Sequence, residues 1–314
     1  MLRAAEAAGH KAWGAAESEV DIRAAAEDGY QVESTVEDAV RLAARQDALI
    51  VVAVPLPAVE PVLSVVAKSA GDCLLTDVVS VKAPMVAAVR GLVPDARYVG
   101  GHPMAGASAS GWAAGSATLF SDAAWVTTVE DDTDLAAWRE VAELALACGA
   151  HVVPTTAEEH DTAVARVSHL PHVLAALLAS VGADGGPLAL SLAAGSFGDG
   201  TRVAGSRPEL VRAMCEGNRA ALLRAVDDAL GRLGVARGAL ASTGSLRATI
   251  DSGHRARRAF TGRALTSRVE VRLDLTTEDA RDALRSLGAQ GGRITALDGS
   301  VALADVPGES SHSG

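Results

Sequence analysis

The chain has 314 residues, of which 49% are hydrophobic and 21% charged, and its formal net charge is -11. This length predicts two domains with room for a small third piece, and the composition is that of a globular protein, which excludes a mainly disordered or collagen-like chain. The acidic balance argues against general nucleic-acid binding, because that requires a basic face.

The first 155 residues alternate between helical patterns and short apolar runs. Helices are expected at 2–9, 20–28, 36–46, 58–69, 83–91 and 133–148. Strands are expected at 10–14, 48–54, 73–79, 97–104, 123–129 and 150–153. Such alternation predicts an α/β domain at 1–155, with a Rossmann-like parallel sheet that helices cover on both sides.

The pattern changes after residue 155. Residues 156–260 contain almost no β-like run, and their apolar residues recur at helical spacing, so we expect a separate all-α domain. Residues 261–314 return to strand character in RVEVRLDL, RITALDG and VALADV, with a helix at 277–287 and a disordered tail. The sequence therefore predicts an α/β domain, then an all-α domain, then a small α+β extension.

The start of the chain looks like the tail of a first βαβ unit. No G-x-G-x-x-G occurs before residue 50, although a dinucleotide fold places this turn under the pyrophosphate at a helix N-terminus. We therefore expect a truncated Rossmann-like sheet that lacks its first strand and turn, and weak or absent cofactor binding. The alternative is a fold that binds no dinucleotide.

Distinctive clusters follow three of the expected parallel strands. They are VPLP at 54–57, DVVSVK at 77–82 and GGHPMAG at 100–106. Open α/β sheets bind ligands outside the carboxyl ends of their strands, so all three clusters are expected to face one crevice. A lone histidine in a glycine-rich turn is usually structural, but His102 at a strand end beside a Ser-x-Lys cluster is a stronger candidate.

The segment SHLPH stands out in the helical region. Pro171 is expected to break or kink the helix and to free a carbonyl. His169 and His172 are three residues apart and share one helix face. A polar kink explains them without chemistry. A metal site would need further ligands such as His160 and Asp161, whose spacing matches no zinc pattern, so no metal is predicted.

Residues 195–202, GSFGDGTR, are expected to form a glycine-rich loop that ends in an arginine. An arginine held by such a loop suits a bidentate grip on a carboxylate. The alternative is a surface loop whose Arg202 is solvated.

Over residues 1–260 the sequence resembles the prephenate/arogenate dehydrogenase family. The resemblance lies in the order and type of five motifs: VAVPLP, DVVSVK, GGHPMAG, SHLPH and F-x-D-x-T-R. The resemblance implies an N-terminal dinucleotide domain and a helical domain that forms a homodimer. It also implies the oxidative decarboxylation of prephenate to 4-hydroxyphenylpyruvate, with hydride transfer to NAD(P), in tyrosine biosynthesis.

The resemblance also implies roles for individual residues. His102 would accept the proton of the ring hydroxyl, with Ser80 between nicotinamide and hydroxyl. Arg202 would bind a substrate carboxylate across the same cleft, and His172 and His169 would line the pocket. The expected cofactor contacts are Val54, Pro55, Leu56, Ser80 and Glu17.

The sequence departs from the family pattern at two places. Many members continue with G-T-E where this chain has Gly106, Ala107 and Ser108, so the choice between prephenate and arogenate stays open. Glu17 lies one place after the usual acidic residue for a ribose hydroxyl, and no arginine is nearby to favour a 2′-phosphate. NAD is therefore preferred, with NADP as the alternative.

Other functions compete with this interpretation. A 3-hydroxyacid or imine dehydrogenase usually relies on a helix lysine, and no lysine follows Lys82. A truncated, non-catalytic binding protein is the other alternative. Residues 261–314 lie outside the resemblance and are equally consistent with a regulatory amino-acid-binding module or an extension packed on the dimer.

The sequence also indicates a compartment. The three cysteines are widely spaced and match neither a disulfide framework nor a zinc site. No continuous apolar run reaches the ~18 residues of a membrane span, and the N-terminus lacks a signal-peptide core. We expect a cytoplasmic protein whose partners are prephenate or arogenate and a second copy, with no nucleic acid or membrane.

Overall fold

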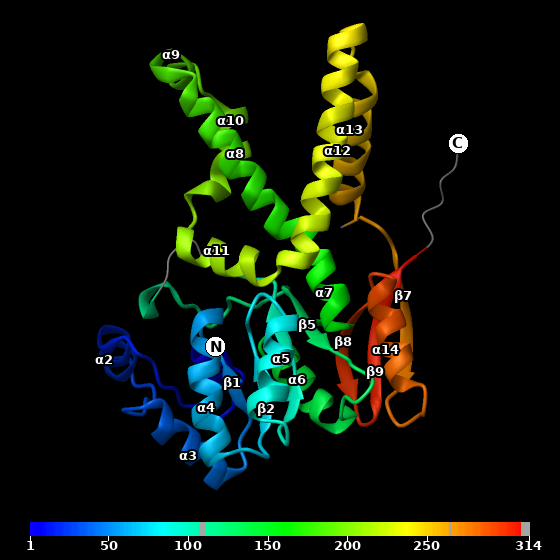
Figure 1. Ribbon diagram of the computed structural model, residues 1–314. Coiled ribbons are helices and arrows are strands. Elements are labelled where there is room, and N and C mark those ends of the chain that lie inside the picture. The colour runs from blue at the N-terminus through cyan, green and yellow to red at the C-terminus, as the bar shows by residue number, and fades with distance from the viewer. Residues whose placement is uncertain (107–110, 264, 309–314) are drawn as a thin grey trace.

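The computed structural model describes residues 1–106, 111–263 and 265–308. Figure 1 shows two sheets and their covering helices at the base, from which a set of longer helices rises. The α/β part therefore precedes the helical part in the chain, and the C-terminal strands return to the base.

The first sheet is parallel, with the strand order β1-β2-β3. Its strands are β1 (Ile50–Val52), β2 (Leu74–Asp77) and β3 (Arg97–Val99). All four residues of the central strand β2 are buried, as expected for a parallel strand covered on both faces. The register pairs Val52 with Asp77 and Thr76 with Val99, so the three strands end at the same edge.

Five helices belong to this first part of the chain, as far as it is described. They are α1 (Leu2–Ala7), α2 (Glu19–Glu27), α3 (Val36–Gln46), α4 (Val59–Ser69) and α5 (Ala83–Leu92). Ser18 and Thr35 cap α2 and α3 by accepting hydrogen bonds from backbone N–H groups in the first turn. The strand expected at 10–14 was wrong, because only Gly14 forms a bridge, with Val32.

The second sheet has the order β4-β5-β6-β8-β9-β7. It begins with β4 (Gly101–Pro103), β5 (Ala124–Thr128) and β6 (His151–Thr155), with α6 (Leu135–Ala147) packed on it. The single parallel strand expected at 97–104 was wrong. The chain leaves the first sheet after Val99, and β4 pairs antiparallel with β5. The change occurs at Gly100, whose N–H donates to Thr128 Oγ1 at 2.9 Å.

The C-terminal segment completes this second sheet. It contains β7 (Arg268–Asp274), α14 (Ala280–Ala289), β8 (Arg293–Asp298) and β9 (Val301–Pro307). Strand β8 pairs with β6 through Ile294 and Val152, and both residues belong to the hydrophobic core around Trp125 and Trp138. The expected small α+β piece is therefore present. It packs on the N-terminal sheet and forms no separate module within the described residues.

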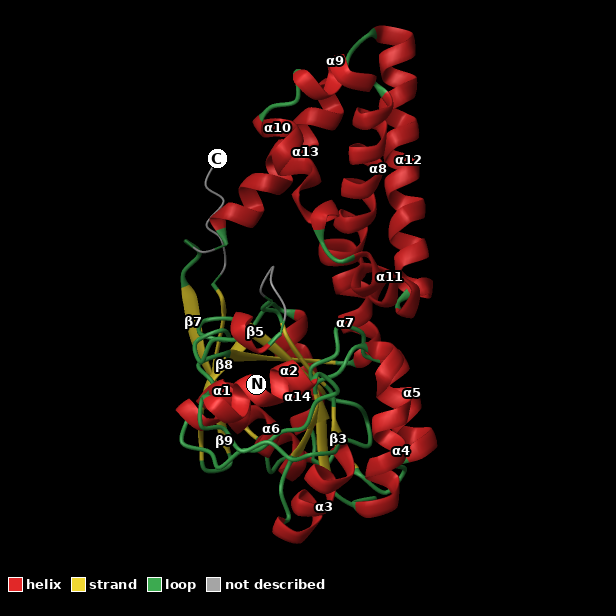
Figure 2. Ribbon diagram, turned by 90° about the vertical axis from the view of Figure 1, so that its left-hand side faces the viewer, coloured by secondary structure: helices red, strands yellow, loops and turns green. Residues whose placement is uncertain are grey.

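The helical part lies between these two contributions to the sheet. Its elements are α7 (Ala157–Val164), a π-helical turn at Ala165–His169, α8 (Leu170–Asp184), α9 (Gly186–Ser191), α10 (Gly195–Thr201), α11 (Pro208–Gly217), α12 (Arg219–Thr243) and α13 (Arg247–Gly262). A capping box between Thr156 and Glu159 starts α7. Figure 2 shows α8, α12 and α13 extending away from the sheets.

The helix Ala157–Asp184 has an unusually apolar surface. It runs for 28 residues with a mean hydropathy of 1.4 in its most apolar window, of which 22% is buried. By length and composition alone it could cross a membrane. Polar residues such as Arg166 and Ser168 interrupt it, so it contains no long continuous apolar run. A helix that packs against another protein subunit meets the same criteria, so this is a weak indication of a membrane span.

Candidate active site

The turns after β1 and β2 lie beneath helix α11. Val54, Pro55 and Leu56 follow β1, and Ser80 lies in the half-buried turn after β2. A Cβ added at Gly217, the last residue of α11, would lie 2.5 Å from Leu56 Cδ2. The end of α11 therefore packs directly on the carboxyl ends of the parallel strands, which is where open α/β sheets bind ligands.

A buried ion pair joins the ends of β2 and β4. The Lys82 ammonium contacts the Asp77 carboxylate and donates to the Gly101 carbonyl at 2.6 Å. Asp77 also accepts from Val79 N–H at 2.7 Å and from Tyr98 O–H at 2.6 Å. Burial lowers the pKa of Lys82, which the neighbouring Asp77 opposes, whereas burial and Asp77 both raise the pKa of Tyr98. This network fixes the backbone next to His102.

Gly101 is required by the close approach of two strands. A Cβ at this position would lie 2.4 Å from the Asp77 carbonyl oxygen, 3.1 Å from Thr76 Oγ1 and 3.2 Å from Trp125 Nε1. Any larger residue would push β4 away from β2. Glycine at this position therefore permits the close approach of the two backbones.

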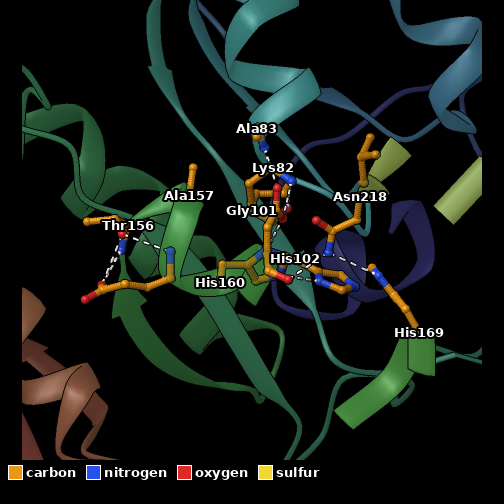
Figure 3. Close-up of polar contacts among 12 residues, drawn as sticks. Lys82, Ala83, Gly101, His102, Thr156, Ala157, His160, His169 and Asn218 are labelled. Carbon is orange, nitrogen blue, oxygen red and sulfur yellow. Dashed lines mark hydrogen bonds and ion pairs between the residues drawn. The ribbon is translucent and has the colours of Figure 1, made fainter. Parts of the chain in front are cut away.

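Strand β4 brings His102 against helix α7, where it meets a second histidine. The His102 Nδ1 and His160 Nε2 atoms are 2.8 Å apart, and the rings pack edge to face at 5.1 Å (Figure 3). Burial, together with the nearby His160, Lys82 and His169, lowers the pKa of His102 to about 2. His102 is therefore a neutral imidazole at physiological pH, as a proton acceptor must be.

His160 is in turn joined to Asp161, the next residue of α7. His160 Nδ1 lies 2.8 Å from Asp161 Oδ1. The two Asp161 oxygens also accept from the backbone N–H groups of Lys82 and Ala83, each at 2.8 Å. Burial would raise the pKa of Asp161, but the hydrogen bonds from His160 and from these two amides hold it below its ordinary value. Asp161 is therefore a carboxylate.

Asn218 connects this cluster to the third histidine. Its side-chain amide donates to the Asp161 carbonyl at 2.7 Å and lies 3.1 Å from His169 Nδ1. Because the amide nitrogen only donates, His169 Nδ1 is the acceptor and its proton lies on Nε2. Burial is the main cause that lowers the pKa of His169, to about 4. The sequence did not identify Asn218 as a site residue. The feature that marks it in the sequence is the Gly217-Asn218 pair within a helical run.

The SHLPH segment bends the helix without breaking it. Residues Ala165–His169 form a π-helical turn, in which Leu170 N–H donates to the Ala165 carbonyl. Pro171 cannot donate a hydrogen bond, and the Ser168 carbonyl accepts from His172 Nδ1 at 2.9 Å. His169 is buried and His172 is half-buried, close enough to lower the pKa of His169.

Arg202 does not lie in the histidine cluster of this chain. The glycine-rich loop expected at 195–202 was wrong, because most of it forms helix α10, in which Phe197 packs over Gly182 of α8 and Thr201 Oγ1 donates to the Phe197 carbonyl. Arg202 follows on an exposed 3-10 turn. Helix α10 packs on α8. Figures 1 and 2 show α10 far from the sheets, and Arg202 directly follows this helix.

The residues expected to contact a dinucleotide suit that ligand chemically. Glu17 is exposed directly before the Ser18 cap of α2, in the segment that follows the Gly14 bridge, so its carboxylate is available to ribose hydroxyls. Val54 is half-buried and Pro55 exposed at the end of β1, which leaves apolar surface for a flat ring. Ala107 and Ser108 lie outside the described residues.

The described ranges contain no group of three or more His, Cys, Asp or Glu side chains that could hold a metal ion. His160 and Asp161, the candidates for such a group, are engaged with His102 and with the N-terminus of α5.

Two family models match consecutive parts of this chain. The model of the prephenate dehydrogenase nucleotide-binding domain matches residues 3–154. The model of the prephenate dehydrogenase dimerization domain matches residues 156–243. The division between them falls at the junction of β6 and α7.

Individual relatives agree with these models. The chain is 34% identical to a prephenate dehydrogenase of Bacillus subtilis over 190 residues, which are 59% of this chain and 51% of that protein. It is 33% identical to a cyclohexadienyl dehydrogenase of Zymomonas mobilis over 68% of this chain and 73% of that protein. The match thus spans about half the length of the Bacillus relative.

A solved structure extends the likeness beyond the family models. A crystal structure of a Corynebacterium glutamicum protein, assigned by name to the prephenate dehydrogenases, has a TM-score of 0.87 and 43% sequence identity. The match covers 93% of each chain, so it includes most of the C-terminal segment.

Proposed function

Because the chain belongs to the prephenate dehydrogenase family, we propose that it catalyses the oxidative decarboxylation of prephenate to 4-hydroxyphenylpyruvate, with NAD as cofactor, in tyrosine biosynthesis. The observation that carries this proposal is a neutral His102 on β4, next to the carboxyl end of β2, where a buried ion pair holds the adjacent Gly101 and a second histidine contacts the ring. A neutral imidazole has the free lone pair that accepting the hydroxyl proton requires.

The position of each side chain suggests its role in the reaction. His102 receives the hydroxyl proton, while Ser80, in the turn after β2, orients the hydroxyl. When bound at the ends of β1 and β2, NAD supplies the hydride acceptor. Val54, Pro55, Leu56 and Glu17 hold the dinucleotide. His169 presents Nε2–H as a donor to the substrate, and His172 lines the pocket.

Arg202 is proposed to bind a substrate carboxylate within the dimer. Its guanidinium is exposed on the helical part, in the segment that the dimerization-domain model matches. An exposed arginine there is available to a site that a second copy helps to form.

The first test is the reaction itself. The purified chain is mixed with prephenate and NAD, and NADH formation is followed by absorbance together with the aromatic product. The proposal expects stoichiometric NADH and 4-hydroxyphenylpyruvate. Dinucleotide binding without turnover of prephenate or arogenate, or no binding at all, indicates instead a non-catalytic relative. Substituting NADP in the same assay tests the choice of cofactor.

Arogenate is the alternative substrate, because the Zymomonas relative is a cyclohexadienyl dehydrogenase, a name that does not single out prephenate. The two substrates differ in the side chain, which carries a keto group in prephenate and an amino group in arogenate. Comparing kcat/KM for the two substrates under identical conditions decides between them.

We propose that the helical part forms a homodimer. Many large apolar side chains are exposed on α8, α9 and α12, including Leu177, Leu188 and Leu233, and dimerization would bury them. Light scattering after gel filtration should give twice the chain mass. Leu177→Glu with Leu233→Glu should give a monomer, whereas Val20→Glu, at an exposed position on α2, should not. A wild-type monomer would contradict the proposal.

We further propose that the protein works in the cytoplasm. Cys73, Cys148 and Cys215 are free thiols, as is usual in a reducing compartment. Fractionation of cells that express the protein should place it in the cytosolic fraction, and recovery with membranes would contradict this assignment.

A further inference from the structure

We propose that His160 and Asp161 form a proton relay behind His102, in which His160 fixes the tautomer of His102 and takes over the positive charge when the substrate hydroxyl releases its proton. His160 touches no substrate in this proposal and acts through His102, so it is a positioning residue. The inference deepens the proposed function and rests on it.

The direction of the relay is set at its buried end. Asp161 is an ionised carboxylate and can only accept hydrogen bonds, so His160 Nδ1 must carry the proton in the 2.8 Å contact with Asp161 Oδ1. The carboxylate cannot turn away, because the Lys82 and Ala83 amides hold both of its oxygens. His160 Nδ1 is therefore committed as a donor.

The same reasoning fixes the next contact. A neutral imidazole carries one proton, so His160 Nε2 has a free lone pair once Nδ1 is protonated. That nitrogen lies 2.8 Å from His102 Nδ1, which must therefore donate. The lone pair of His102 is left on Nε2, where it can accept a proton from the substrate. Without His160, nothing in this chain of contacts would select that tautomer.

The charges around the cluster explain why a relay is needed. A cation on His102 is opposed by burial and by the neighbouring His160, Lys82 and His169, which together lower the pKa of His102 to about 2. Asp77 is occupied by Lys82, and Tyr98 donates to Asp77. Among the described residues, Asp161 is the carboxylate that hydrogen-bonds to the histidine pair, through His160.

Transfer of the second proton therefore moves the positive charge from His102 to His160, which contacts the Asp161 carboxylate. When His102 Nε2 accepts the hydroxyl proton, the proton on Nδ1 can pass to His160 Nε2. His102 is then neutral again, and the imidazolium of His160 lies in contact with the Asp161 carboxylate.

The proton and electron balance of the step is complete. The C–H electron pair leaves the substrate as hydride and reduces NAD. The electron pair of the bond to the ring carboxylate enters the ring as carbon dioxide departs, which leaves a phenolate. The proton then returns from His160 through His102 to the phenolate oxygen. The relay stores one proton and releases none.

Two substitutions separate positioning from proton uptake. In His160→Gln, the amide oxygen can still accept from His102 Nδ1–H but cannot take up the proton. In His160→Leu, both functions are lost. The matched control is His151→Gln on β6, a half-buried histidine outside the cluster. All variants are assayed at saturating NAD, with prephenate varied over a range of pH.

The relay predicts that His160→Gln lowers kcat by about 100-fold, the scale of proton-transfer catalysis, with KM changed less than about threefold. His151→Gln keeps the wild-type kcat and KM. A His160→Gln enzyme with wild-type kcat would overturn the relay.

A second measurement does not depend on turnover. Two-bond 1H–15N NMR correlations of the histidine-labelled protein report which ring nitrogen carries the proton. The relay predicts Nδ1–H for His102 and His160 in the wild type, the same His102 tautomer in His160→Gln, and its loss in His160→Leu. Nε2–H on His102 in the wild type would refute the relay even in an active enzyme. The predicted tautomers in an inactive wild type would instead contradict the proposed function.

Discussion

Replacing Lys82 with methionine tests the buried ion pair that supports His102. Lys82 is fully buried, and its ammonium is the cationic partner of Asp77. Removing one member of a buried pair typically costs about 3–5 kcal/mol. Asp77 keeps the donors from Val79 and Tyr98, which favours the low end, but the Gly101 carbonyl loses its donor, which adds about 1 kcal/mol. We therefore expect a loss of about 4 kcal/mol in the free energy of unfolding.

Urea unfolding at fixed protein concentration measures this loss, because a dimer makes the midpoint concentration-dependent. The double variant Lys82→Met/Asp77→Asn removes the uncompensated charge and should recover about 2 kcal/mol relative to the single variant. If Lys82→Met stays within about 1 kcal/mol of the wild type, or if the double variant is no more stable than the single one, the ion pair does not support the site as described. If Lys82→Met does not fold, a folded double variant still shows that the unpaired Asp77 charge caused the loss of stability.

Three further predictions address the glycine contact, the buried histidines and the substrate grip. Gly101→Ala should destabilise by about 1–3 kcal/mol in urea melts, since its Cβ would lie 2.4 Å from the Asp77 carbonyl. Gly91→Ala, in helix α5 with no atom within 4 Å of the new Cβ among the described residues, should not destabilise. The pKa of His169 falls from 6.5 to about 4, so the unfolded chain binds more protons and stability should decrease as the pH drops through this range. His169→Gln should flatten that slope by about 1.4 kcal/mol per pH unit, and an unchanged slope would reject a neutral buried His169. Arg202→Ala should mainly raise KM for prephenate, and an unchanged KM would remove Arg202 from the substrate site.

The parts of the fold that the sequence predicted well are those that local patterns determine. The buried runs around Val52 and Leu75 became parallel strands, because continuous β-branched and aliphatic residues suit a strand covered on both faces. The change from alternating elements to helices at the β6–α7 junction was also predicted. There the capping box of Thr156 and Glu159 marks the helix start in the sequence itself.

The misplaced elements depend on partners that are distant in the chain. The strand expected at 97–104 is divided because β4 finds β5 as its neighbour. The glycine-rich segment after Gly195 becomes helical because Phe197 can pack over Gly182. The C-terminal strands join the first domain's sheet through the pairing of Ile294 with Val152. None of these contacts leaves a local pattern.

The sequence indicated His102, on which the proposed site is centred, but it did not indicate the contacts that hold His102 in place. The GGHPMAG motif identified His102 because glycine, histidine and proline at a strand end form an unusual combination. The sequence pattern indicated His160 and Asp161 only as candidate metal ligands, and it did not indicate Asn218. Their contacts join residues from α7 and α11 to the ends of β2 and β4, and sequence spacing carries no information about such distances.

The most direct test of the proposed function is turnover by His102→Asn, with dinucleotide and prephenate binding measured on the same preparation. Asparagine keeps a polar side chain of similar reach but cannot accept the hydroxyl proton. The account predicts that turnover falls by about 100-fold or more while both ligands still bind. Near-normal turnover in this variant would contradict it, because the hydroxyl proton would then leave by a route that does not pass through His102.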